Sequence, residues 1–149
     1  MRVGLTCLLG LSLLCSACTL WPVPDDGEVI ARTLSDRKTF RAGLEDSCAD
    51  LPAIDGTISA AIGIGAPIYN AGSALGCYRI YEGAAYKLLY HLGDRCPRAS
   101  AVLRAGLSQA EADVGDNAKA WTMRATFDAI LGDETGTGGS LAPPKTGEL

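Results

Sequence analysis

The sequence predicts an all-α domain, built as a small bundle of four or five helices with short connections. Between residues 35 and 131, apolar residues recur at steps of three and four, and no window alternates with a period of two. Glycines, prolines and capping residues separate these periodic segments. With 149 residues, of which 48% are hydrophobic and 20% charged, the chain has the length and composition of about one folded domain.

The first two expected helices cover residues 36–48 and 56–72. Ser35 is a suitable N-cap for the first, because its hydroxyl can accept a hydrogen bond from a free backbone N–H. The inner face of this helix consists of Phe40, Leu44 and Cys48. Asp55 is the expected cap of the second helix, but two glycines and Pro67 weaken its helical pattern. A broken helix or an irregular loop is therefore the alternative there.

The last three expected helices have start and stop signals. The boundaries are Ser73 and Gly93 for the third helix, Pro97 and Gly115 for the fourth, and Asp116 or Asn117 and Gly132 for the fifth. The apolar face of the third helix consists of Tyr78, Tyr81, Ala85, Leu88, Leu89 and Leu92. That of the fourth helix consists of Leu103, Leu107, Ala110 and Val114, and that of the fifth consists of Ala120, Met123, Phe127, Ile130 and Leu131. Each face repeats every three or four residues, so we expect all three to turn toward one core.

The first eighteen residues, MRVGLTCLLGLSLLCSAC, have the organisation of an export signal. Arg2 supplies a positive charge, residues 3–14 form an apolar segment, and small residues precede Cys18. This arrangement resembles a bacterial lipoprotein signal peptide with its lipobox, although Cys15 stands where that family usually has leucine. The resemblance implies that the signal peptide, residues 1–17, is removed and that Cys18 is acylated and becomes the new N-terminus.

The N-terminal lipid is expected to hold the protein on a membrane, since each buried methylene adds about 0.8 kcal/mol of binding free energy. By resemblance to enterobacterial sorting, Thr19 after the acylated cysteine favours the outer membrane, with the domain facing the periplasm. Ordinary secretion to the periplasm is the alternative, because Cys-Ser-Ala before Cys18 also fits the small-x-small rule for signal cleavage. Residues 58–69 are the next most apolar stretch, and we expect them to be too short to span a bilayer.

The segments on either side of the domain have a different composition. We expect residues 18–34 to form a lipidated tether, because two prolines and three acids near their start disfavour a helix. Residues 132–149 are rich in Gly, Thr and Pro, and we expect a disordered tail. Removal of Arg2 with the signal leaves twelve basic and seventeen acidic side chains, a net charge of −5. Without a basic stripe, we expect no nucleic-acid partner.

Three cysteines remain in the mature chain besides Cys18, and an exported domain enters an oxidising compartment. Cys77 and Cys96 lie at opposite ends of the third expected helix, roughly 22 Å apart, whereas a disulfide needs Cα atoms about 6 Å apart. Their pairing therefore fails unless the helix breaks at Gly83. In an up-and-down bundle, Cys96 returns to the level of Cys48, so we predict a Cys48–Cys96 disulfide and a buried free thiol at Cys77.

Two strips of side chains are candidate partner surfaces. The first strip, on the third helix, consists of Arg79, Gly83, Tyr86 and Tyr90. The second strip, on the fifth helix, consists of Trp121, Arg124 and Asp128. Tyrosine and arginine are favoured in interface cores, and glycine permits close approach. Arg124 and Asp128 are four residues apart and can form an ion pair on one helix face. The alternative is that the fold itself covers both strips.

A pocket for a small ligand is a second possibility. Its candidate residues are Tyr69, Tyr78, Tyr81 and Glu82, beside the glycine-rich second segment. Glu82 lies toward the inner edge of its helix and needs a partner there, which Arg79 three residues earlier can supply. A functional carboxylate at Glu82 is the alternative, but no base is paired with it.

Signatures of catalysis and metal binding are missing from the sequence. It contains no G-x-S-x-G, H-E-x-x-H, P-loop lysine or C-x-x-C, and the single histidine, His91, has no second ligand at useful spacing. We therefore expect no catalytic residue, no metal and no cofactor. The leading hypothesis is a non-enzymatic, lipid-anchored periplasmic domain that binds another protein or supports an envelope assembly. A carrier or sensor of lipid, haem or aromatic ligands is the second hypothesis, and an envelope-acting enzyme using Glu82 or His91 is the third.

Overall fold

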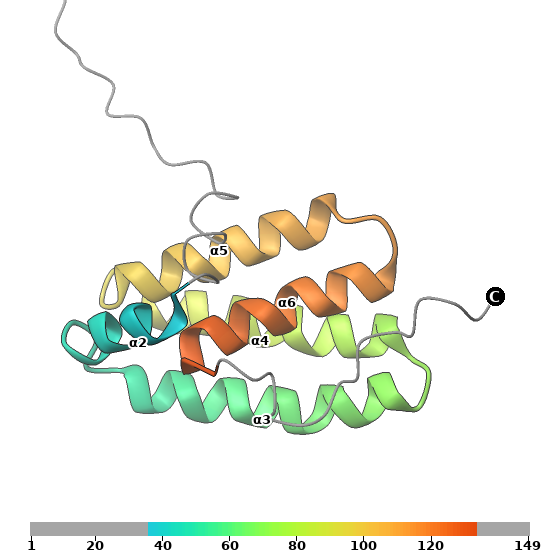
Figure 1. The fold of residues 1–149 in the computed structure, drawn as a ribbon, viewed down its shortest axis with the longest axis horizontal. Helices are drawn as coiled ribbons and strands as arrows, with labels where there is room; N and C mark the ends of the chain where they lie inside the picture. The colour runs from blue at the N-terminus through green and yellow to red at the C-terminus, as the bar shows by residue number, and fades with distance from the viewer. Residues whose placement is uncertain (1–35, 134–149) are drawn as a thin grey trace, which may run out of the picture.

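A computed structural model describes residues 36–133, which form five helices and no strand within that range (Figure 1). The helices are α2 (Arg37–Glu45), α3 (Leu51–Asn70), α4 (Ala74–Leu92), α5 (Pro97–Ala112) and α6 (Asp116–Leu131). The prediction of an all-α bundle with short connections is confirmed. The signal peptide, Cys18, the tether and the tail from residue 134 lie outside the described residues.

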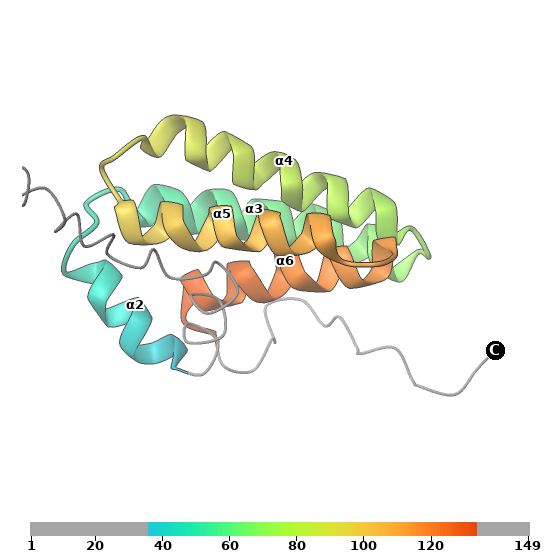
Figure 2. The same ribbon diagram turned by 90° about the horizontal axis from the view of Figure 1, so that it is seen from above.

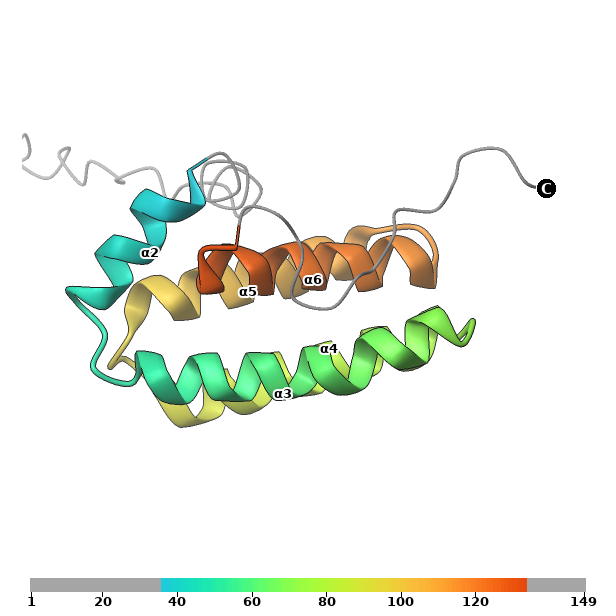
Figure 3. The same cartoon turned by 60° about the horizontal axis from the view of Figure 1, so that its bottom comes forward.

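The four long helices run antiparallel to their neighbours in the chain and form two layers. Figure 3 shows α3 and α4 in one layer and α5 and α6 in the other. α4 also packs against α5 and α6, so it connects the layers. The short helix α2 crosses the end of the bundle where α3 begins and packs against α6 (Figure 2). α6 is therefore surrounded on more sides than any other helix of the described range.

The core lies between the two layers. Its fully buried side chains include Leu44, Ile54, Ile58, Tyr81, Leu103, Met123, Phe127 and Ile130. The rings of Tyr81 and Phe127 meet edge to face, with centroids 5.4 Å apart, and join α4 to α6. Gly65 lets α3 approach this pair, because a Cβ atom there would collide with the Tyr81 ring. A glycine that weakens the helix in isolation therefore permits its packing against α4.

Capping explains most helix boundaries. The Ser73 hydroxyl accepts a hydrogen bond from the Gly76 backbone N–H at 3.2 Å, and Pro97 is the first residue of α5, both as predicted. Gly132 ends α6 in the left-handed conformation, with φ of 74°. Some expected boundaries are wrong. The cap of α2 is Asp36, whose carboxylate accepts from the Thr39 N–H, and not Ser35.

The second wrong expectation concerns the end of α5. This helix ends at Ala112, two residues before Val114, so Val114 does not continue its inner face. Val114 is 96% exposed. The chain becomes extended at Asp113, which removes the helical periodicity that placed Val114 inside.

α3 begins earlier than predicted and does not break. Asp50 is its N-cap, and Pro52 lies in the first turn, where a missing N–H costs no hydrogen bond. Asp55 lies inside the helix and accepts two hydrogen bonds from Arg41, at 2.6 and 2.7 Å. The helix continues through its glycines and Pro67 to Asn70, so the alternative of a broken helix or loop is wrong.

The greater length of α3 also corrects the estimate made for residues 58–69. An 18-residue window within the 20 residues of α3 has a mean hydropathy of 1.3, so by length and composition this helix is apolar enough to cross a membrane. A core helix of a globular bundle satisfies the same criterion. One face of α3 does pack in the core, through residues such as Ile54, Ile58 and Ile62.

The predicted disulfide is confirmed. Cys48 and Cys96 are bonded, with Cα atoms 5.1 Å apart, and they connect the end of α2 to the start of α5. Cys77 on α4 is buried and free. Burial raises the pKa of the Cys77 thiol, so it stays protonated and unreactive at neutral pH.

Candidate partner-binding surface

The first predicted strip lies on the outer face of α4. Tyr86 is 58% exposed and Tyr90 is 85% exposed, and Arg79 and Gly83 are exposed beside them. A helix turns about 100° per residue, which places this strip opposite the buried side of α4. We name these four residues the tyrosine strip. Two large aromatic side chains at this exposure are unusual for a helix that otherwise has a well-packed inner face.

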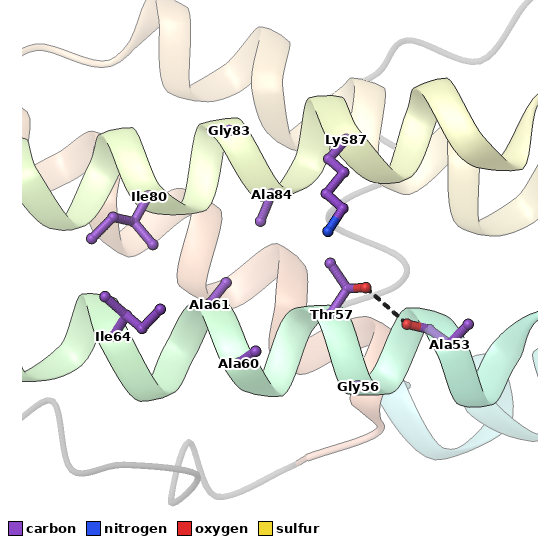
Figure 4. A pocket seen from close by; sticks show the side chains of 10 residues that line it. All are labelled: Ala53, Gly56, Thr57, Ala60, Ala61, Ile64, Ile80, Gly83, Ala84 and Lys87. Carbon is purple, nitrogen blue, oxygen red and sulfur yellow. Dashed lines mark hydrogen bonds between the residues drawn. The ribbon is translucent and has the colours of Figure 1, made fainter.

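An open groove lies beside the tyrosine strip, between the outer faces of α3 and α4. Its volume is about 490 Å³. It is lined by Ala53, Gly56, Thr57, Ala60, Ala61, Ile64, Ile80, Gly83, Ala84 and Lys87. Figure 4 shows Ile80, Ala84 and Lys87 of α4 pointing toward α3. Gly83 belongs both to the groove and to the tyrosine strip, so the two features form one continuous surface.

The chemistry of this surface is apolar with one charge. Residues 56–72 contain no charged side chain, although Ile64 and several small residues among them are exposed. Lys87 is the one charged residue that lines the groove. It makes no ion pair or hydrogen bond with another residue of the range 36–133. The groove therefore offers apolar contact over most of its length and a single unpaired ammonium group.

The second predicted strip does not lie on the surface. Arg124 and Asp128 form the expected ion pair, with Nε to Oδ1 at 2.8 Å, but they are only 1% and 4% exposed. Trp121 is half-buried, and its Nε1 donates to the Tyr69 hydroxyl at 2.9 Å. The i,i+4 spacing correctly predicted that the two side chains pair. It did not predict their burial, which follows from the central position of α6 in the bundle. Neither Arg124 nor Asp128 is available to a partner in this fold.

The four candidate pocket residues have different surroundings in the described part of the chain. Tyr81 is in the core, and Tyr69 bonds to Trp121 and to the side-chain oxygen of Asn117. Tyr78 donates its hydroxyl to Glu82 at 2.7 Å. None of the four lines the groove between α3 and α4.

Glu82 is held in a local network on the surface. Arg79 donates to its other carboxylate oxygen at 2.7 Å, which confirms the expected partner. Burial raises the pKa of Glu82, but the hydrogen bonds from Arg79 and Tyr78 outweigh this effect and lower it overall. Burial, together with the bond to Glu82, raises the pKa of Tyr78 to about 12. Glu82 is therefore a stably ionised acceptor, and a poor proton donor at neutral pH.

The two residues of the enzyme hypothesis, Glu82 and His91, are not brought together on α4. Glu82 and His91 are nine residues apart on one helix, which separates them by roughly 13 Å along its axis. Among residues 36–133, no three His, Cys, Asp or Glu side chains are grouped so that they could hold a metal ion.

The groove itself was not predicted from the sequence. Its α3 side, from Ala53 to Ile64, belongs to the helix whose start was misplaced. The sequence signal for the groove is the stretch 56–72, which contains no charged residue. Only the buried face of a helix needs to be uncharged, and this stretch also includes positions on the other face. The exposed face of an ordinary surface helix carries charged side chains, so their absence marks a face with another role.

Comparison with known proteins gives no match: no family model, no curated protein and no solved structure is similar enough to this chain to indicate a relationship. Function must therefore be inferred from the chain's own sequence and geometry.

Proposed function

We propose that this chain is a lipid-anchored periplasmic domain, not an enzyme, that binds another protein of the cell envelope. The lipobox-like signal ending at Cys18 supports the anchor and the outer membrane as its location. The Cys48–Cys96 disulfide is consistent with this location, because disulfides persist in oxidising compartments.

The observation that carries the binding proposal is the exposure of Tyr86 and Tyr90 beside an uncharged groove. Tyrosine is enriched at protein interfaces because it offers a large apolar ring with a polar tip. Gly83, between the strip and the groove, allows a partner backbone to approach α4 closely. The result is a continuous surface with aromatic anchors on one side and a recess on the other, a typical arrangement of an interface core.

The two other hypotheses have less support. A small-ligand carrier usually encloses most of its ligand in a cavity, whereas the groove is open along one side. An enzyme using Glu82 would need that carboxylate to exchange protons, but Arg79 and Tyr78 already bind both of its oxygens.

Photo-cross-linking in the producing bacterium tests the proposal. The full-length precursor is made with p-benzoylphenylalanine in place of Tyr90, and a matched variant carries it in place of Ala101, which is exposed on α5 in the other layer. We expect an ultraviolet-dependent adduct with an envelope protein from position 90 but not from position 101. The change of Tyr86 and Tyr90 to alanine should release the same protein from the purified complex. An adduct of equal yield from both positions, or none from position 90, would contradict the proposal.

The lipid anchor is tested separately. Mass spectrometry of the mature N-terminal peptide should find acylated Cys18, and Cys18→Ser should move the protein from the membrane fraction to the soluble periplasm. An unmodified mature N-terminus would support ordinary secretion instead.

A further inference from the structure

We infer that the groove between α3 and α4 receives a helix of the partner protein, one with small apolar residues on its contact face and a carboxylate that meets Lys87. This inference rests on the proposed function and specifies the chemistry of the partner at the same surface.

The shape of the groove favours a helix. Its floor and walls are small side chains, Ala53, Gly56, Ala60, Ala61 and Ala84 among them. Between two neighbouring helices, such residues leave a recess into which the ridge of a third helix can pack at short interaxial distance. An amphipathic helix in an apolar groove is a recurring mode of protein recognition.

The charge of the groove fixes a second property of the partner. Lys87 is the one charged lining residue, and it has no ion-pair partner among the described residues. Figure 4 shows its ammonium group above Thr57, over the groove and not away from it. A partner that covers it without a counter-charge would bury an unpaired cation, which is strongly unfavourable. A carboxylate on the partner helix removes this penalty and sets the register of the complex.

A second copy of this chain fits the groove less well. A two-fold contact brings the same patch of both molecules together. The basic residues at this face are Arg79 and Lys87, and the one acid beside them, Glu82, already binds Arg79. Lys87 of each copy would therefore find no free carboxylate among the residues that line the groove.

A lipid surface and the chain's own ends also fit less well. Membrane-binding helices insert large apolar side chains, whereas most of the residues that line this groove are small. The described ends of the chain lie together, since Arg37 donates to the Asp133 carbonyl. Figure 3 shows the start of α2 and the end of α6 on the side of the bundle away from the outer faces of α3 and α4.

Cross-linking from inside the groove tests the inference. The full-length precursor carries p-benzoylphenylalanine at Thr57, which lines the α3 side of the groove, and the adduct is mapped by mass spectrometry on both molecules. We expect one adduct, with a helical segment of another protein that has small residues at four-residue spacing and an acid on the same face. Lys87→Glu should lower the yield of this adduct by about tenfold, whereas Lys87→Arg should leave the yield unchanged. Changing the acid of the partner helix to lysine should restore binding to the Lys87→Glu variant.

A matched pair of variants tests the shape requirement. Ala60→Leu fills the groove, whereas Ala101→Leu makes the same change at an exposed position of α5. The groove variant alone should lose about tenfold in yield, and circular dichroism should show both variants folded.

Every other result overturns the inference. These results are no adduct at Thr57, an adduct with lipid, with a second copy or with the chain's own termini, or a protein adduct that tolerates Lys87→Glu. If position 90 still gives a protein adduct while Thr57 gives none, the proposed function stands and the groove inference alone fails.

Discussion

The guanidinium of Arg124 donates from Nε to Oδ1 of Asp128 over 2.8 Å inside the bundle, where the two residues are 1% and 4% exposed. They lie one turn apart on α6, with Arg124 beside Tyr81 of α4 and Asp128 near Arg37 of α2. Burial raises the pKa of Asp128, and the hydrogen bond from Arg124 opposes this effect without cancelling it. A buried pair of this kind adds little stability compared with apolar residues, but it becomes very unfavourable when one partner is removed.

Removal of one partner of this pair should therefore be far more damaging than removal of both. We expect Arg124→Met and Asp128→Leu each to lower the free energy of unfolding by about 3–5 kcal/mol, because each removes the ion-pair partner of a buried charged side chain. The double variant should lose much less than the sum. Urea unfolding of the four proteins gives this coupling energy directly.

The exposed pair on α4 provides the control for that cycle. Arg79 is well exposed, so Arg79→Ala should change the free energy of unfolding far less than either substitution in the buried pair. Additive losses for Arg124→Met and Asp128→Leu would show that the two side chains are not energetically coupled.

The disulfide should be a major contributor to stability. It joins residues 48 positions apart, and in the chain-entropy model such a loop stabilises the folded state by roughly 4 kcal/mol. Reduction, or the change of Cys48 and Cys96 to serine, should lower the free energy of unfolding by about that amount. Cys77 should react with a thiol reagent only after unfolding, because it is buried.

Peptide mapping without reducing agent checks the same prediction at the level of connectivity. The expected cross-linked peptides contain Cys48 and Cys96, and the peptide with Cys77 should be found alone. A bridge between Cys77 and Cys96 would require α4 to open, since Cys77 lies in its first turn and Cys96 follows its far end.

The glycines of α3 and α4 should respond to alanine in opposite directions. A Cβ atom added at Gly63 or Gly83 meets nothing within 4 Å, so alanine there should raise the free energy of unfolding by about 0.5–1 kcal/mol through helix propensity. A Cβ atom at Gly65 collides with the Tyr81 ring, so Gly65→Ala should be destabilising. Thermal unfolding of the three variants measures this difference. Stabilisation by Gly65→Ala would mean that α3 does not pack closely on α4.

The features that the sequence predicts correctly are those set by local chemistry. Ser73 caps α4 because a hydroxyl at that position satisfies a free N–H, and Pro97 starts α5 because its ring already has a helical φ. The Cys48–Cys96 pair follows from helix length and from the up-and-down order of the helices, because an intact α4 keeps Cys77 away from Cys96 and the antiparallel return brings Cys96 to Cys48.

The features that the sequence does not predict depend on contacts between helices. Pro52 stops the preceding helix, but it equally suits the first turn of the next, and local chemistry does not decide between them. Arg124 and Asp128 look like a surface pair until α4 and α5 close over α6. The groove requires the register of α3 against α4, which is set in part by the fit of Gly65 to Tyr81.

The last prediction concerns the acid dependence of stability. The pKa of Glu82 is lowered from 4.5 because the ionised form accepts hydrogen bonds from Arg79 and Tyr78. A lowered folded-state pKa contributes stability above pH 4.5, and this contribution is lost as the pH falls through the folded-state value. We expect Glu82→Gln to lower the free energy of unfolding by about 1 kcal/mol at pH 7 and to reduce its decline below pH 4.5. Tyr78→Phe, which removes one of the two donors, should give an intermediate decline. Urea unfolding across this pH range makes the comparison, and an unchanged acid decline in Glu82→Gln would show that the network does not favour the carboxylate.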